Sequence, residues 1–175
     1  PGGMGVMPGH VTILGVFVAD TSFRADRQPK IGETILGNAF ALGPGGKGSN
    51  QAVAAARAGA DVRFISKLGE ATFGDMALQT WAGAGVTPVV SRHAEAATGA
   101  AFIFVEEATG NNAIIISPGV AATISVDDIR ANREQIETAA VFVTQLEQPL
   151  EAALEALKIA RAAGVRTILN PAPAA

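Results

Sequence analysis

The sequence lacks cysteine altogether and has only two histidines among its 175 residues. The missing cysteines exclude disulfide bonds and thiolate catalysis, and they are typical of a protein from a reducing cytoplasm. The two histidines, His10 and His93, lie far apart in the sequence, and neither belongs to a cluster with ligand spacing. We therefore predict no metal site and no histidine-based catalytic triad in this chain.

Charge and long apolar runs are also scarce. Only 17% of the residues are charged and the net charge is −3, which gives no electrostatic reason to expect nucleic acid or an anionic membrane as a partner. No apolar run approaches the roughly 18 residues that cross a bilayer. Residues 1–10 lack a basic segment followed by an apolar one, so we expect a flexible extension there, no signal peptide, and a cytoplasmic location.

Hydrophobic residues make up 49% of the chain, enough to build the core of one domain. Short apolar runs alternate with helical patterns, which predicts an α/β fold whose parallel sheet is flanked by helices. We expect strands over residues 11–18, 61–66, 86–90, 140–145 and 165–170, and helices over residues 49–60, 73–84, 125–138 and 150–163. Two strand-rich segments, about residues 20–43 and 98–117, have no helix between their strands; within the first, residues 33–40 alternate as a half-exposed strand pair would. These segments predict a small antiparallel flap beside the main sheet.

The most informative motif is Gly45-Gly46-Lys47-Gly48-Ser49-Asn50-Gln51-Ala52, which precedes and opens a helical pattern. Glycine allows positive φ and close approach of a ligand, and a helix N-terminus presents free N–H groups. A phosphate-binding P-loop requires Gly-Lys followed by Ser or Thr, and here Gly48 follows Lys47. The letters over residues 43–48 do match the dinucleotide pattern G-x-G-x-x-G, but Lys67 stands where that fold needs an acid after the second strand. A glycine turn that serves only tight packing is the third alternative.

The motif resembles the first signature of the ribokinase (phosphofructokinase-B type) family of sugar kinases. Further stretches fall in ribokinase-like order, so the resemblance covers about residues 11–175: they are residues 14–20, 29–34, 98–101, 145–149 and 169–174. It implies a Rossmann-like, ribokinase-like α/β domain with a small β lid, formed by the two flap segments. It also implies ATP-dependent phosphorylation of a sugar hydroxyl, with magnesium and, as an open alternative, a monovalent cation as cofactors.

In this family the glycine loop holds the sugar. The resemblance therefore implies substrate-binding roles for Asp20, Gly46, Lys47, Gly48, Asn50, Ala101 and Glu147. Ionised carboxylates suit such a site because they accept strong hydrogen bonds from hydroxyl groups. Each residue also has an alternative that does not involve a sugar: Asp20 as a turn cap, Glu147 as a solvated acid, Lys47 as an exposed lysine, Ala101 as a packing residue.

One position departs from the family pattern. Ribokinases proper carry an asparagine two residues before the aspartate of the first motif, and this chain has Val18 there. A sugar hydroxyl left unpaired against valine costs roughly 1–3 kcal/mol. Val18 is therefore a candidate for substrate specificity: it disfavours D-ribose and leaves another pentose, a hexose or a nucleoside open.

The catalytic base of the family lies in a Gly-Ala-Gly-Asp run, which this chain lacks; the nearest sequence has Val86 in place of the aspartate. We expect residues 1–175 to carry the sugar-binding half of a kinase, inactive alone, with the catalytic base and most ATP contacts beyond this chain. A non-catalytic sugar-binding or regulatory protein and a nicotinamide-dependent oxidoreductase are the alternatives. A homodimer through the lid is an open expectation, because lid strands in this family often pair between subunits.

Overall fold

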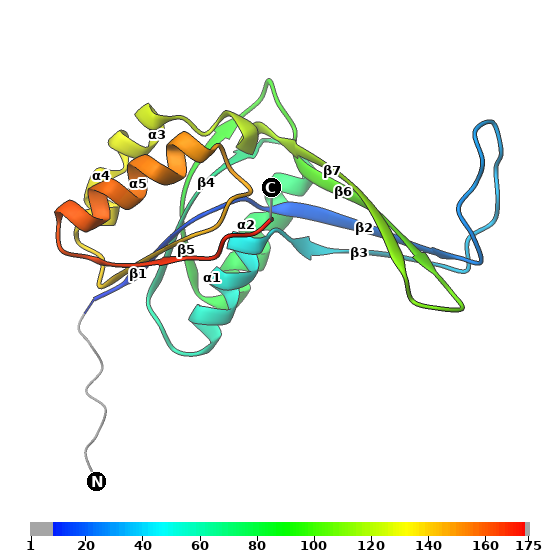
Figure 1. Ribbon diagram of the computed structural model, residues 1–175, viewed down its shortest axis with the longest axis horizontal. Coiled ribbons are helices and arrows are strands. Elements are labelled where there is room, and N and C mark those ends of the chain that lie inside the picture. Colours follow the sequence, from blue (N-terminus) through cyan, green and yellow to red (C-terminus); the bar gives the residue numbers. More distant parts are fainter. Residues whose placement is uncertain (1–8, 174–175) are drawn as a thin grey trace, which may run out of the picture.

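The computed structural model describes residues 9–173 and contains two sheets (Figure 1). The strands are β1 (Val11–Leu14), β2 (Val18–Ala25), β3 (Ala39–Gly45), β4 (Val62–Gly69), β5 (Val86–His93), β6 (Thr98–Glu106), β7 (Asn112–Gly119), β8 (Val141–Thr144) and β9 (Arg166–Leu169). The helices are α1 (Lys47–Arg57), α2 (Thr72–Ala84), the 3-10 turn η1 (Val120–Thr123), α3 (Val126–Ala131), α4 (Arg133–Glu137) and α5 (Leu150–Ala162). No helix in this part of the chain is long and apolar enough to cross a membrane.

The larger sheet is fully parallel, with strand order β5-β4-β1-β8-β9. Successive residues of its central strand point to opposite faces, as the pleat of a strand requires. Ile13 packs with residues of α1 and α2, and Leu14 packs with residues of α3, α4 and α5. Helices therefore cover both faces of the sheet, which confirms the predicted α/β class.

The smaller sheet forms the lid and has the order β3-β2-β6-β7. Its two hairpin pairs are antiparallel, whereas the central pair, β2 with β6, is parallel. The lid strands extend away from the helices, and residues 26–38 form an arm at their far end (Figure 1). The two segments that lacked helices in the sequence thus supply all four lid strands.

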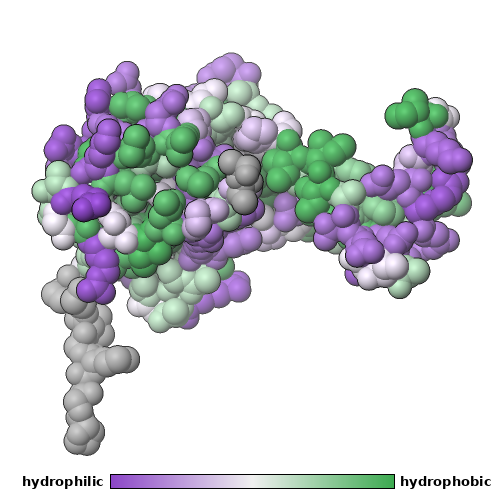
Figure 2. Space-filling model, viewed as in Figure 1, coloured by the Kyte–Doolittle hydropathy of each residue, from purple (hydrophilic) through white to green (hydrophobic). Residues whose placement is uncertain are grey.

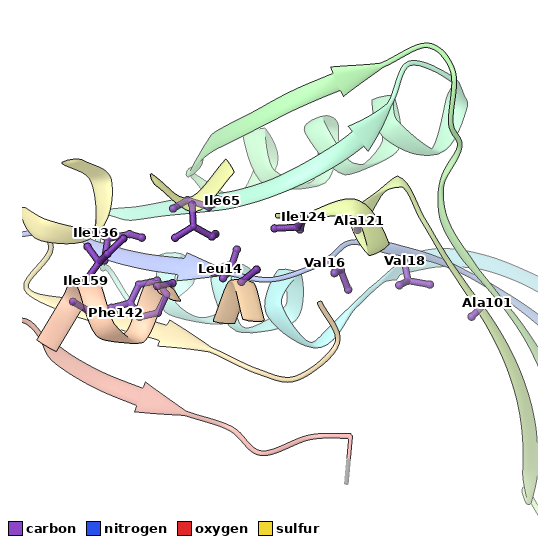
Figure 3. Packing of buried hydrophobic residues seen from close by; sticks show 14 residues of the cluster. Leu14, Val16, Val18, Ile65, Ala101, Ala121, Ile124, Ile136, Phe142 and Ile159 are labelled. Carbon is purple, nitrogen blue, oxygen red and sulfur yellow. The ribbon is translucent and has the colours of Figure 1, made fainter. Parts of the chain in front are cut away.

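One apolar cluster connects the body to the lid. It runs from Ile136 and Phe142, next to α5, past Leu14 to Val18 and Ala101 on the lid strands (Figure 3). The base of the lid therefore shares its core with the α/β body, and the side chains that β2 carries there have a defined position relative to the main sheet.

Three sequence predictions about these elements are wrong in detail. The single strand expected over residues 11–18 is two strands in different sheets, separated by residues 15–17. Residues 33–38 are not a strand, because Arg27 binds both carboxylate oxygens of Glu33 at 2.7 and 2.5 Å and the Lys30 N–H donates to that carboxylate, which holds a turn. The helix expected over residues 125–138 breaks at Asn132, whose side chain donates to the Asp128 carbonyl at 2.9 Å.

His10, expected in the flexible extension, is buried, and its Nε2 lies 3.1 Å from the Gln135 carbonyl oxygen. The folded part therefore includes His10. The prediction of a flexible extension otherwise falls on residues 1–8, which lie outside the described residues.

Candidate sugar-binding site

The topology locates a site before any side chain is considered. From β1 the chain proceeds to β4 and β5 on one side, and later to β8 and β9 on the other. Ligands of open α/β sheets bind outside the carboxyl ends of the strands where the order reverses in this way. Here that point lies between the ends of β1 and β8, where residues 15–20 and 145–147 follow the strands.

A pocket of about 180 Å³ lies at this point, between the lid and the N-terminus of α1. Six of the seven predicted binding residues and the specificity candidate line it: Asp20, Gly46, Lys47, Asn50, Ala101, Glu147 and Val18. The remaining wall consists of Ile103, Ile114 and Ile116 from the lid. Larger pockets exist elsewhere, and the one lined by Asp127 and Glu151 also lies at helix N-termini, but none of those described combines two carboxylates with a lysine.

Glu147 is bound to the first residue of α1. Its Oε2 accepts the Lys47 backbone N–H at 2.7 Å, and its Oε1 lies 3.2 Å from Lys47 Nζ. Its side chain is only 12% exposed. A carboxylate is favourable at the positive end of a helix dipole. The contacts exclude a solvated loop acid at Glu147 and an unpaired surface lysine at Lys47.

Asp20 faces Glu147 across the pocket, on the lid strand β2. Its partners in the sheet are Gly43 on β3 and Ala101 on β6, and its carboxylate lies against Gly45, where an added Cβ would be 2.3 Å from Oδ2. Within residues 9–173 no hydrogen bond to that carboxylate is present, so Asp20 is not a turn cap. Burial raises the pKa of Asp20, the nearby Glu147 carboxylate raises it further, and Lys47 lowers it in part.

The backbone at Gly46 has a conformation and a close contact that only glycine allows. Its φ is 93°, a region that L side chains avoid, and a Cβ there would lie 2.3 Å from the Val16 carbonyl oxygen. This contact joins the loop to the segment between β1 and β2. The backbone of Gly46 can therefore line the pocket while α1 starts at the next residue.

Gly48 is the predicted binding residue that does not line the pocket. It is buried, and a Cβ at this position would lie 2.7 Å from Gly15 Cα and 2.8 Å from Gln145 Oε1. Its side of α1 thus packs against the ends of β1 and β8. The structure places Gly48 in the contact between elements, behind the wall of the pocket.

Sequence reasoning missed the apolar wall and the buried amides. Ile114 and Ile116 alternate along β7, so they share one face of the lid, and this alternation was a usable signal. Gln145 is fully buried at the end of β8, and nothing in the sequence distinguished it from an exposed glutamine. The site therefore has four polar side chains and an apolar wall, an arrangement typical of small-molecule pockets.

The described residues do not fit magnesium-bound nucleotide. Magnesium in nucleotide sites is bound by one or two carboxylates together with phosphate oxygens. Across residues 9–173 no group of three or more His, Cys, Asp and Glu side chains is placed to hold a metal ion, and Glu147 is already paired with Lys47. We assign no step of phosphoryl transfer to this pocket.

With the geometry in place, comparison with known proteins decides the family. The model of the pfkB family of carbohydrate kinases matches residues 10–175. The chain belongs to this family. Staphylococcus aureus ribokinase is 40% identical over 170 residues, which cover 96% of this chain and 56% of the ribokinase. Salmonella typhi deoxyribokinase is 34% identical over 165 residues, which cover 94% of this chain and 54% of that enzyme.

A solved structure shows the same fold. Arabidopsis thaliana ribokinase complexed with ribose and ATP superimposes with a TM-score of 0.84 at 29% identity, covering 95% of this chain and 54% of that chain. The pfkB chain described here therefore spans about half the length of the relatives that it matches.

Proposed function

We propose that this pfkB chain is the sugar-binding half of an ATP-dependent sugar kinase. One observation carries the proposal: Asp20, Lys47, Asn50 and Glu147, which come from three distant parts of the sequence, line one pocket at the switch point of the sheet. Two carboxylates, an ammonium group and an amide can accept from and donate to the hydroxyl groups of a sugar. Gly46 and Ala101 leave space for the ring.

In this proposal the nucleotide, magnesium and any monovalent cation bind to the half of the protein that this chain does not include. Structures of relatives support the nucleotide: one ribokinase is described with ribose and ATP, and another with ADP. The catalytic base also belongs to that other half, so the 175-residue chain alone should bind sugar and transfer no phosphate. We place the kinase in the cytoplasm, in agreement with the lack of cysteine.

The test is titration calorimetry of the purified chain with a panel of pentoses and hexoses, followed by assays for ATP turnover. We expect binding of at least one sugar, and no ATP-dependent phosphorylation until the full-length protein is used. Phosphoryl transfer by the 175-residue chain alone would contradict the proposal that the catalytic base and the nucleotide site lie outside this chain. Sugar binding without transfer by the full-length protein would favour the non-catalytic alternative, a sugar-binding or regulatory protein.

We further propose that the substrate presents a carbon without a hydroxyl group to Val18. Val18 is 4% exposed and lines the same pocket as Ile103, so this side of the site offers no hydrogen-bond partner. A deoxypentose meets this requirement, and one relative is named as a deoxyribokinase. D-Ribose would leave a hydroxyl unpaired if it bound in this orientation.

Val18→Asn tests the specificity. We expect the variant to favour ribose over 2-deoxyribose relative to the wild type, by about tenfold, because one hydrogen bond is gained. Ala101→Gly, on the neighbouring lid strand β6, serves as a control that enlarges the pocket without adding a polar group. An unchanged sugar ranking in Val18→Asn would refute the role of Val18.

A homodimer through the lid is the assembly we propose. The lid face opposite the sugar pocket is apolar and half exposed, with Phe23 beside Phe40 and Phe102. Apolar side chains are exposed on the lid strands as a whole, and in the view of Figure 2 apolar surface covers these strands where they leave the body. Contiguous exposed apolar surface of this kind is typical of protein interfaces.

A further inference from the structure

A buried amide joins the strand end that carries Glu147 to the helix that carries Lys47. Gln145 follows β8 directly and is fully buried. Its Nε2 donates a hydrogen bond to Gln51 Oε1, on the second turn of α1. The bond between Gln145 and Gln51 therefore links the two elements that carry Glu147 and Lys47, and neither glutamine lines the pocket itself.

The backbone around this link is packed as closely as glycine permits. Gly15, at the end of β1, and Gly48, in α1, each lie against Gln145 Oε1, which would be 2.7 and 2.8 Å from a Cβ at these two positions. That oxygen is buried and has no hydrogen-bond partner within the described residues. A buried carboxamide oxygen without a partner costs stability, and the packing and the one donated bond of Gln145 offset this cost.

Gln148 completes the arrangement on the strand side. Its Nε2 donates to Thr144 Oγ1 at 2.8 Å and to the Gln145 carbonyl at 2.6 Å. These bonds close the turn over residues 144–148, in which Glu147 is the residue that reaches the pocket. The position of the Glu147 carboxylate thus depends on the turn, and the position of the Lys47 N–H depends on α1.

We propose that Gln145 is a positioning residue, which sets α1 against the 144–148 turn and thereby fixes the spacing between Lys47 and Glu147. The inference rests on the proposed sugar site, but its geometric part can be observed separately. Replacement of Gln145 by methionine keeps the length of the side chain and removes the bond to Gln51. The N-terminus of α1 is then free to shift relative to Glu147.

The protein contains a reporter for this shift. Trp81 is its single tryptophan, is fully buried, and donates its indole N–H to Ser49 Oγ on the first turn of α1 at 2.9 Å. The indole N–H resonance of Trp81 and the backbone amide resonance of Lys47 therefore report the position of α1 without any ligand.

The experiment compares Gln145→Met, Gln51→Met and the double variant with Gln79→Met, a control at an exposed glutamine of α2. The ¹H–¹⁵N resonances of Lys47 and Trp81, the thermal midpoint, and the affinity for D-ribose and 2-deoxy-D-ribose are measured on the 175-residue chain. We expect both single variants to move the Lys47 resonance and to weaken pentose binding about tenfold, because a displaced Lys47 loses one hydrogen bond to the sugar. The double variant should be no weaker than either single variant, because both remove the same bond, and the control should match the wild type.

A lower thermal midpoint with unchanged pentose affinity and an unmoved Lys47 resonance would overturn the inference, since the glutamine would then be merely structural. If the double variant loses as much pentose affinity as the two single variants combined, Gln51 and Gln145 do not act through one shared bond, and the proposed link is wrong. If the wild type binds none of the pentoses and hexoses of the panel while the Lys47 resonance still moves in the variants, the proposed function fails and the positioning stands. If Gln145→Met does not fold, Gln51→Met alone decides by the same criteria.

Discussion

A single carboxylate on the lid, that of Asp20, combines poor solvation with a place in the candidate site. Its pKa is raised above the ordinary value of 3.8, first by burial and then by Glu147. Because the folded state favours the protonated form, the ionised Asp20 opposes folding at neutral pH, and this cost falls as the pH drops through the raised pKa. A residue that costs stability and contacts the pocket is typical of a functional group.

Asp20→Asn should therefore raise the thermal midpoint at pH 7 and weaken sugar binding by roughly tenfold to a hundredfold, the range for hydrogen bonds to charged groups. The stability gain should vanish below the ordinary pKa, where Asp20 is itself protonated. Thermal unfolding between pH 3 and pH 8, with calorimetric titration of the sugar, checks both parts. A lower midpoint at pH 7 would contradict the argument.

Gly45 is required because it leaves space for the Asp20 carboxylate. A Cβ at this position would lie 2.3 Å from Asp20 Oδ2, so alanine would displace the carboxylate. We expect Gly45→Ala to weaken sugar binding at least tenfold, since the hydrogen bonds of Asp20 are lost. Gly43→Ala is the matched control, because nothing lies within 4 Å of its added Cβ. Equal sugar affinities in the two variants would refute this reading.

At the scale of elements, an ion pair anchors α3 to the main sheet. Lys67 on β4 lies 2.7 Å from Asp128, and it also donates to the Thr123 carbonyl at 3.0 Å. Ser125 and Asp128 form a capping box at the start of α3. Burial would raise the pKa of Asp128, but hydrogen bonds from Lys67 and Ser125 outweigh it, and the pKa is lowered. Lys67, which occupies the position where a dinucleotide-binding fold needs an acid, therefore stabilises the N-terminus of α3 against β4.

Lys67→Met should lower the free energy of unfolding at pH 7 by about 1 kcal/mol, since a partly exposed charged hydrogen bond is lost. The lowered pKa means that this stabilisation is complete above the ordinary pKa of Asp128 and is lost as the pH falls through the lowered one. The difference from the wild type should therefore shrink in acid. Urea unfolding at pH 7 and pH 3 measures it, with the exposed Lys158→Met as control; a difference independent of pH would contradict the pairing.

At the scale of the whole molecule, the lid has two faces with different properties. Val18 and Asp20, at even positions of β2, line the sugar pocket, whereas Phe23, at an odd position, lies beside Phe40 and Phe102 on the outer apolar face. Phe40, Leu42 and Ile115 on that face are 59%, 46% and 71% exposed. The lid can therefore close a site on one side while it associates on the other.

Phe40→Asp should convert a dimer to a monomer, because it places a charge in the middle of the proposed interface. Sedimentation velocity over a range of concentrations measures the association. Leu150→Asp, at a 69% exposed leucine of the body, is the control and should leave it unchanged. A wild-type chain that stays monomeric at all concentrations would rule out the lid interface.

Most elements could be predicted from the sequence because their signals are local. The β1 and β4 runs are short and β-branched, and α2 ends at Gly85, whose φ is 80°. The errors occur where a distant contact overrides the pattern. Residues 11–18 read as one strand, but close packing of Gly15 on Gly48 turns the chain there, and the pairing of Arg27 with Glu33 replaces a strand with a turn.

The sequence alone determined the α/β class, the two lid segments, and the residue types that sugar hydroxyl groups require. Only the tertiary structure decided that Lys47 and Glu147, 100 residues apart, share two hydrogen bonds, that Gly48 packs behind the pocket, and that Gln145 links α1 to β8. The physical reason is the range of the interactions. Propensity and periodicity act between neighbours along the chain, whereas close approach, burial and carboxylate pairing depend on which strand ends the folded sheet brings together.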